Sequence, residues 1–375
     1  MSVPFWLEEP RPELPQRRFD GAVDVEVVGG GVTGCACALA LAEAGLRVRL
    51  HEAREIAGGA SGRNGGFALR GTAAPYPVAV ETMGREAAKS FWHATAKAIE
   101  AMAELAGDAL RRTGSLRIAD DAEEEAELRD EYEALCSDGL AAEWVEGADL
   151  RPVGRFVAAI FHPTDAVLQP ARWVRRLAVH AVEAGADIRE GSRVASLDDL
   201  EAEHVVVATD GYPSGLLGDF EGAVVPTRGQ MVATEPLVDL LWERPHYARH
   251  GFDYWHQTSD GRLLAGGFRD VSLLTELTTA EVTTPVIQSA LDAFVACLVG
   301  RPVAITHRWA GLFGLVPDLL PVVGPVPGHE NVWVAGGYTG HGNVLGFLCG
   351  RLVADAILGR PAAPEVALFD PARLA

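Results

Sequence analysis

Short apolar runs and a helical pattern alternate along the first fifty residues of the chain. The apolar run at 24–28 predicts a strand, the alanine-rich run at 35–44 predicts a helix that Gly45 ends, and the run at 46–51 predicts a second strand. Strand, helix and strand in this order are typical of a βαβ unit, in which both strands lie parallel in one sheet. The chain therefore begins as an α/β protein.

A different pattern follows in the middle of the chain. Residues 252–257 alternate in side-chain character, Asp260-Gly261 predicts a tight turn, and 263–267 predicts the returning strand of a hairpin. Residues 229–234 predict a further strand. Helices are predicted over 173–184 and 343–358, the second directly after a strand at 331–335. The middle region thus predicts an antiparallel sheet beside the α/β part.

Composition narrows the class of protein. The 375 residues are 48% hydrophobic and 22% charged, which is typical of a folded globular chain of about two domains. The net charge of −20 repels phosphate backbones, so we expect no nucleic-acid partner. We expect no membrane span because no apolar run reaches 18 residues, and a cytoplasmic protein because the N-terminus does not resemble a signal peptide.

The cysteines add no metal site. Their positions show no ligand spacing with histidine, and in a reducing compartment we expect all five to be free thiols. They are Cys35, Cys37, Cys136, Cys297 and Cys349.

A glycine-rich turn joins the first strand to the first helix. Residues 29–34 read GGGVTG, and Glu52 follows the second strand at the distance that a dinucleotide-binding unit requires. Gly29 permits a tight turn, Gly31 lets the backbone approach a pyrophosphate, and Gly34 lets helix and strand pack closely. The helix start offers free N–H groups to the phosphates, and Glu52 offers acceptors to a ribose. Val32, Thr33 and Ala53 complete this candidate cofactor set. The turn alone leaves NAD and FAD both open.

The loop GGASGRNGGF at 58–67 bears on that choice. It resembles the flavin-contacting loop of the D-amino-acid-oxidase-like superfamily of FAD-dependent oxidoreductases, which contains glycine oxidase, sarcosine oxidase and gamma-glutamylputrescine oxidase. The ASGRNGG form is most similar to the last of these. The resemblance implies that the glycines bring the backbone against the flavin while polar side chains contact it. The implied contacts are Gly59, Ala60, Ser61, Arg63, Asn64, Gly65 and Gly66.

Later segments extend the resemblance over nearly the whole chain. The stretches at 167–170 and 185–194 resemble the segment whose valine backbone, here Val194, faces adenine, and HVVVATDGY at 204–212 resembles the ATNAY strand end, with Asp210 in place of asparagine. RWAG at 308–311, VPDLLP at 316–321 and AGGYTGHGN at 335–343 resemble the closing flavin-binding signature. The implied contacts are Ala208, Thr209, Gly211, Gly311, Gly337, Gly340, His341, Gly342 and Asn343.

The resemblance implies a Rossmann-like FAD-binding domain and a discontinuous substrate domain built on an antiparallel sheet. We expect the FAD-binding domain to comprise 1–75, 148–215 and 302–375, and the substrate domain to comprise 76–147 and 216–301. The fold class is thus α/β plus α+β.

Substrate-side candidates lie mainly in the predicted hairpin. Tyr254 and His256 share one strand face, and a face turned to the flavin would place an aromatic wall and one titratable group there; an ordinary buried sheet face explains the pattern equally well. His341 is a candidate base, although a histidine in a glycine loop also serves loop geometry. Candidate apolar contacts for the substrate are Phe313, Tyr254 and Trp255.

The expected activity is FAD-dependent oxidation of a C–N bond to an imine that water hydrolyses, with O2 or another acceptor taking the electrons. An NAD-dependent dehydrogenase, an oxidase or dehydrogenase of glycine, D-amino acids or N-methyl amino acids, and a flavin-bearing subunit of a larger complex stay open. Lys89 and Lys97 are the only lysines, and both lie outside the flavin segments, so the chain does not decide between oxidase and dehydrogenase. The oligomeric state is likewise undecided.

Two absences shape the expected site. Residues 309–318 contain no cysteine and 58–67 no histidine, so we expect noncovalent FAD. Phe313 and Val344 stand where the resemblance implies a carboxylate-binding arginine or lysine, so we expect a substrate whose reacting carbon bears no carboxylate. A primary or secondary amine such as a gamma-glutamylated polyamine fits. Arg70 and Arg228 are the replacement cations if this expectation fails.

Overall fold

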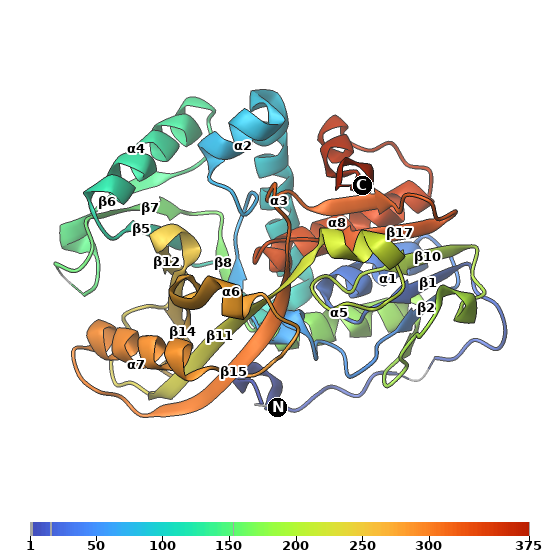
Figure 1. The fold of residues 1–375 in the computed structure, drawn as a ribbon, viewed down its shortest axis with the longest axis horizontal. Helices are drawn as coiled ribbons and strands as arrows, with labels where there is room; N and C mark the ends of the chain where they lie inside the picture. Colours follow the sequence, from blue (N-terminus) through green and yellow to red (C-terminus); the bar gives the residue numbers. More distant parts are fainter. Residues whose placement is uncertain (1–2, 16, 153, 375) are drawn as a thin grey trace.

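A computed structural model describes residues 3–15, 17–152 and 154–374, and it has two lobes, each built around a sheet (Figure 1). One sheet has the order β16-β17-β10-β1-β2-β9. Its strands are parallel except for the antiparallel β16-β17 pair. In chain order they are β1 (Val25–Val28), β2 (Val48–His51), β9 (Asp187–Arg189), β10 (His204–Val207), β16 (Val322–Pro325) and β17 (Val332–Gly336).

Helices pack closely on this sheet and on one another. Helix α1 (Val32–Glu43) is buried from Val32 to Ala42, so it is apolar all round. It packs between α5 (Pro170–Ala184) and α8 (Gly342–Ile357), and α3 (Arg85–Ala106) lies against both of these helices. A Cβ on Gly350 would stand 2.3 Å from the carbonyl oxygen of Thr33, so only glycine permits this approach of α8 to α1.

The second lobe is built on an eight-stranded sheet with the order β15-β11-β14-β13-β12-β5-β7-β6. Neighbouring strands are antiparallel except for the parallel β5-β12 pair. In chain order they are β5 (Ser115–Ala119), β6 (Glu143–Glu146), β7 (Ala158–His162), β11 (Val225–Pro236), β12 (His246–Ala248), β13 (Asp253–Gln257), β14 (Arg262–Gly267) and β15 (Ile305–Leu315).

Further helices flank this sheet, and three short strands form a small third sheet. Helix α7 (Pro285–Val299) packs on β11 and β14, and α4 (Ala122–Ser137) packs on β5 and β7. The remaining helices are α2 (Tyr76–Met83) and the short α6 (Leu273–Glu276). The third sheet has the order β3-β8-β4, with β3 (Phe67–Ala68), β4 (Leu110–Arg111) and β8 (Ala166–Leu168). Within the described ranges, every helix is too short or too polar to span a bilayer.

The mixed fold class is confirmed, as are the βαβ unit and the predicted hairpin. The expected domain boundaries, however, cut across the eight-stranded sheet. Strands β7 and β15 lie in segments that we assigned to the FAD-binding domain, yet they pair with β5 and β11 of the other lobe. The expected boundaries at 148 and 302 therefore do not follow the division between the two large sheets, because β-pairing over long sequence distances leaves no local signal.

Candidate functional site

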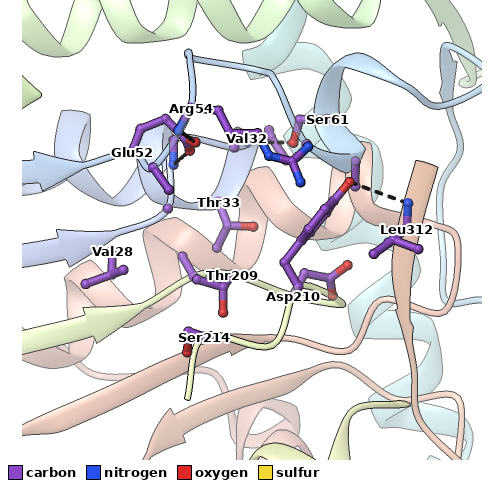
Figure 2. A pocket seen from close by; sticks show the side chains of 18 of the residues that line it. Val28, Val32, Thr33, Glu52, Arg54, Ser61, Thr209, Asp210, Ser214 and Leu312 are labelled. Carbon is purple, nitrogen blue, oxygen red and sulfur yellow. Dashed lines mark hydrogen bonds between the residues drawn. The ribbon is translucent and has the colours of Figure 1, made fainter. Parts of the chain in front are cut away.

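A cavity of about 360 Å³ lies at the carboxyl ends of the parallel strands, where open α/β sheets bind their ligands. Segments from both lobes line it, and Figure 2 shows side chains that converge on it. The sequence-predicted residues that line it are Gly29, Gly31, Val32, Thr33, Glu52, Ala53, Gly59, Ala60, Ser61, Asn64, Val194, Ala208, Thr209, Phe313, Gly340, Gly342 and Asn343.

The glycine-rich turn is tightly packed at the start of α1. Gly29 has a φ of 116°, and a Cβ on Gly34 would stand 1.9 Å from the Gly29 carbonyl oxygen. A Cβ on Gly31 would stand 2.9 Å from the hydroxyl oxygen of Ser61, which accepts a hydrogen bond of 3.0 Å from the backbone N–H of Val32. The flavin-type loop thus meets the glycine-rich turn at the helix end that favours phosphate.

Glu52 stands at the carboxyl end of β2 with both oxygens on backbone donors. Its carboxylate accepts hydrogen bonds of 2.7 Å from the N–H groups of Gly30 and Arg54 (Figure 2). Burial raises the pKa of Glu52, and these two bonds oppose the rise. The carboxylate is therefore fixed at the cavity wall, with lone pairs left for ribose hydroxyls.

Asp210, which replaces the asparagine of the resembled motif, ties three segments together. Its two carboxylate oxygens accept hydrogen bonds from the N–H groups of Gly337 (2.8 Å) and Gly314 (2.9 Å). Its own φ of 47° lies in the left-handed region, which aspartate tolerates better than most residues. Each of the two N–H groups needs an oxygen to accept its hydrogen bond. A carboxylate has two oxygens, whereas the amide of asparagine has only one.

The loop at 58–67 is held rigidly in spite of its glycines. Arg63 donates hydrogen bonds to the carbonyl oxygens of Gly58 (2.9 Å) and Ala310 (3.2 Å), and its own carbonyl accepts from the indole N–H of Trp309 (2.8 Å). The side chains of Asn64 and Asn343 bond to each other, at 3.2 and 3.0 Å. The loop is therefore tied to β15 on one side and to the start of α8 on the other.

Several predicted contacts do not line the cavity. They are Gly34, Arg63, Gly65, Gly66, Gly211, Gly311, Gly337 and His341. Most of these glycines permit close packing: a Cβ would stand 2.4 Å from the Leu168 carbonyl oxygen at Gly66, 2.3 Å from the Phe313 backbone at Gly211, and 2.8 Å from the Arg63 side chain at Gly311. These residues support the cavity wall from behind.

Tyr254 of β13 lies in a slot whose walls are glycines. A Cβ would stand 3.2 Å from its ring at Gly65 of the loop, and 2.3 Å from it at Gly266 of β14. At Gly229 of β11, a Cβ would stand 3.8 Å from both the Tyr254 hydroxyl and the Phe313 ring. Tyr254 thus reaches from the eight-stranded sheet to the loop, and its hydroxyl and the Phe313 ring both lie over Gly229. Burial raises its pKa to about 12, so it stays protonated at neutral pH.

The two candidate histidines are neutral at pH 7, and His256 is buried whereas His341 is half-buried. Burial lowers the pKa of His256 and of His341 to about 4 each. His256 is 2% exposed, is stacked on Trp6 and lies edge-on to Phe67. It does not line the cavity, and its ring packs against aromatic side chains. His341 immediately precedes α8, and its Nδ1 is buried without a hydrogen-bond partner among the described residues.

Trp255, which we expect as a substrate contact, does not line the cavity. Its side chain is fully buried on the opposite face of β13 from Tyr254, stacked on Phe156 and His246 and edge-on to Phe294 of α7. Side chains of neighbouring residues in a strand point to opposite faces of the sheet, so Trp255 belongs to the core of the lobe built on the eight-stranded sheet.

The remaining lining residues are not among the contacts that the sequence predicts, although Asp210 stands out there as the replacement for an asparagine. They are Val28, Gly30, His51, Arg54, Ser192, Arg193, Asp210, Tyr212, Pro213, Ser214, Thr279, Leu312 and Tyr338. Many adjoin predicted residues, so widening each motif by one position would have found them. Thr279 comes from the lobe of the eight-stranded sheet, and no sequence motif points to it.

Thr279 belongs to a segment that covers the cavity, residues 277–284, here called the covering segment. Its Glu281 accepts hydrogen bonds from Arg54 (2.7 Å) and from the Tyr212 hydroxyl (2.5 Å), and both donors line the cavity. The covering segment is thus fastened to the parallel-sheet lobe by one carboxylate.

The cavity fits a dinucleotide that carries a flavin. The glycine turn, the helix start and Glu52 suit the pyrophosphate and a ribose, while Val194 stands at the adenine end that the resemblance implies. The other end of the cavity reaches Phe313 and the loop at 58–67. A flat ring system bound there would meet glycine backbone and an aromatic side chain. For the residues that the structure describes, no cluster of histidine, cysteine and carboxylate could hold a metal ion.

Comparisons with known proteins agree with this geometry. The chain is 28% identical to gamma-glutamylputrescine oxidoreductase of Escherichia coli, over 90% of this chain and 84% of that protein, and 27% identical to glycine oxidase of Geobacillus kaustophilus, over 93% and 97%. It is also 28% identical to the probable oxidoreductase OrdL of Rhizobium meliloti, over 93% and 86%. The crystal structure of the Geobacillus glycine oxidase has the same fold, with a TM-score of 0.75 and 24% identity, over 94% of this chain and 98% of that one. The sequence model of the family described as FAD dependent oxidoreductase (DAO) matches residues 24–356, so the chain belongs to this family of FAD-dependent enzymes.

Proposed function

We propose that this FAD-dependent enzyme oxidises the C–N bond of a primary or secondary amine whose reacting carbon bears no carboxylate. The product is an imine, which water hydrolyses to a carbonyl compound and an amine. A gamma-glutamylated polyamine is a substrate of this kind, and the similarity to the E. coli gamma-glutamylputrescine oxidoreductase supports that choice.

One observation carries the proposal: Phe313 lines the cofactor cavity where the resemblance implies an arginine, and the two replacement cations, Arg70 and Arg228, are engaged elsewhere. Arg228 forms a bidentate ion pair with the buried Glu276, at 2.7 and 2.8 Å. Arg70 donates to the Ala141 carbonyl oxygen and to His162 at 3.1 Å. A carboxylate buried beside Phe313 would gain no ion pair from either arginine, and leaving it unpaired costs several kcal/mol.

FAD, held by the glycine-rich turn, Glu52 and the loop at 58–67, would supply a two-electron acceptor for a hydride from the carbon next to nitrogen, with loss of one N–H proton and formation of the C=N bond. This chain's residues hold and orient the amine. Tyr254 donates from its hydroxyl, while Phe313 and Phe67 exclude water, so that the amine is held neutral near the reacting atom.

The test is anaerobic mixing of the purified enzyme with a panel of amines and amino acids while flavin absorbance is followed. We expect gamma-glutamylated diamines and simple amines to bleach the flavin. Rapid bleaching by glycine, sarcosine or D-amino acids, with none by amines, would refute the proposal.

The same experiment with oxygen present addresses the acceptor. Hydrogen peroxide formed in proportion to substrate indicates an oxidase, and turnover that needs an artificial acceptor indicates a dehydrogenase. Activity of the isolated chain, with gel filtration, separates a complete enzyme from a flavin-bearing subunit.

A further inference from the structure

Arg269, in the turn after β14, presents a guanidinium without a counter-ion beside the cavity. Its guanidinium carbon lies 4.8 Å from the centre of the Phe252 ring and 5.5 Å from that of the Phe313 ring. The side chain is half-buried, and burial lowers its pKa. Among the residues that the structure describes, none accepts a hydrogen bond from it.

The neighbouring carboxylate does not neutralise this charge. Asp270 accepts hydrogen bonds from Arg249 instead, at 2.9 and 3.3 Å. Arg228, also close to the cavity, is fully paired with Glu276. Arg269 is therefore a partly desolvated cation without a protein partner, and such a cation gains most from an anionic ligand.

The position of Arg269 sets where that ligand lies. Phe313 lines the cofactor cavity, whereas Arg269 does not and stacks on the Phe313 ring. The Tyr254 hydroxyl lies near the same ring, and it is close enough to Arg269 for the two groups to affect each other's pKa. An anion held by Arg269 thus stands one aromatic ring away from the cofactor, with the tyrosine hydroxyl as a second donor.

We propose that Arg269 binds a carboxylate of the substrate that is remote from the reacting carbon, and so selects amines that carry a distal acid group. This inference rests on the proposed amine oxidation and adds the specificity of the same site. The planar guanidinium offers two parallel donors, which match the two oxygens of a carboxylate. The Phe252 and Phe313 rings lie against the guanidinium and restrict its motion, which reduces the entropy lost on binding.

The experiment measures binding of an unreactive acid to the FAD-loaded enzyme by the perturbation of flavin absorbance. Hexanoate is compared with its uncharged amide, hexanamide, so that only the charge and its acceptors differ. We expect wild type to bind hexanoate about tenfold or more tightly than hexanamide. Arg269→Met should abolish that preference, and Arg269→Lys should keep part of it because it retains the charge without the fork.

Arg351→Met is the matched control, since Arg351 also lies over an aromatic ring, that of Phe347, and is exposed. It should keep the wild-type preference. Equal binding of acid and amide by wild type, an undiminished preference in Arg269→Met, or tighter binding of inorganic phosphate than of hexanoate would each overturn the inference. If Arg269→Met does not retain FAD, the inference is tested by the wild-type preference for hexanoate over hexanamide and by its reduction in Arg269→Lys. This binding experiment measures no turnover, so its result does not depend on whether the amines of the panel reduce the flavin.

Discussion

At the residue scale, Asp210 shows how one side chain can hold a cofactor site together without touching the chemistry. Its carboxylate receives N–H groups from the segment after β17 and from β15, so it joins the end of the parallel sheet to the strand that carries Phe313. Charge-assisted hydrogen bonds of this length are among the stronger polar contacts in proteins.

We predict that Asp210→Asn lowers the free energy of unfolding by about 1–3 kcal/mol, because the amide nitrogen cannot accept the second N–H and leaves it unsatisfied. Urea unfolding of the FAD-loaded protein measures the change. Asp292→Asn is the control, since Asp292 is a largely exposed carboxylate that also bonds an arginine, and it should change stability by less than about 0.5 kcal/mol. Equal stability of Asp210→Asn and wild type would contradict this account.

At the element scale, the covering segment joins the two lobes at the cavity. Glu281 fastens it to Arg54 and Tyr212 of the other lobe, while Thr279 lines the cavity itself. The segment has no regular structure of its own between α6 and α7, so these contacts hold it in place.

We predict that Glu281→Gln speeds the release of FAD by about tenfold, because the ion pair with Arg54 is lost and the segment opens more often. Strong dilution of the FAD-loaded protein, followed by the rise in flavin fluorescence as FAD leaves it, measures the rate. Glu235→Gln changes an exposed carboxylate at the end of β11 and should leave the rate unchanged. An unaltered rate in Glu281→Gln would show that the segment does not gate the cavity.

The elements themselves were largely predictable from the sequence, whereas their partners were not. The strand at 24–28, the helix at 343–358 and the hairpin around Asp260-Gly261 have local patterns, and each is present within a few residues. The pairing of β5 with β12 joins residues about 130 positions apart, so no local pattern reports it. No local pattern reports Thr279 or Arg269 either. Both belong to the stretch of chain that follows β14, and they reach the site only because the eight-stranded sheet brings this stretch to the cavity.

At the scale of the whole molecule, buried neutral histidines make stability depend on pH. Burial lowers the pKa to about 4 for His256 and His341 and to about 3 for His246. The unfolded chain binds protons at these residues below about pH 6.5, whereas the folded protein does not, so stability falls with pH below that value. Asp165 acts in the opposite direction, because burial raises its pKa to about 6.

We therefore predict that the free energy of unfolding decreases by about 2–3 kcal/mol per pH unit near pH 5. Urea unfolding of the FAD-loaded protein at a series of pH values between 7.5 and 4.5 measures this slope. His256→Asn should make the slope shallower, and His93→Asn, which changes an exposed histidine, should not. A stability that is flat or rising toward acid would refute the prediction.

The attachment of FAD is also a property of the whole assembly of segments. We predict that acid precipitation releases the flavin into the supernatant, because the stretches that carry attachment residues in the resembled family contain no cysteine at 309–318 and no histidine at 58–67. Absorbance of supernatant and pellet measures the partition, with a covalent flavoprotein treated in parallel as the control. A yellow pellet would show a covalent bond.

The order of strands in the parallel sheet has a consequence for how the protein is made. Strand β1, near the N-terminus, lies between β2 and β10, and β17 joins the sheet beyond β10. During synthesis, β1, α1 and β2 leave the ribosome long before residues 204–207 and 332–336 exist to pair with them and α8 exists to cover α1. The apolar surface of α1 then stays uncovered until the chain is almost complete. We expect the nascent chain to depend on chaperones and to accept FAD only after translation of α8.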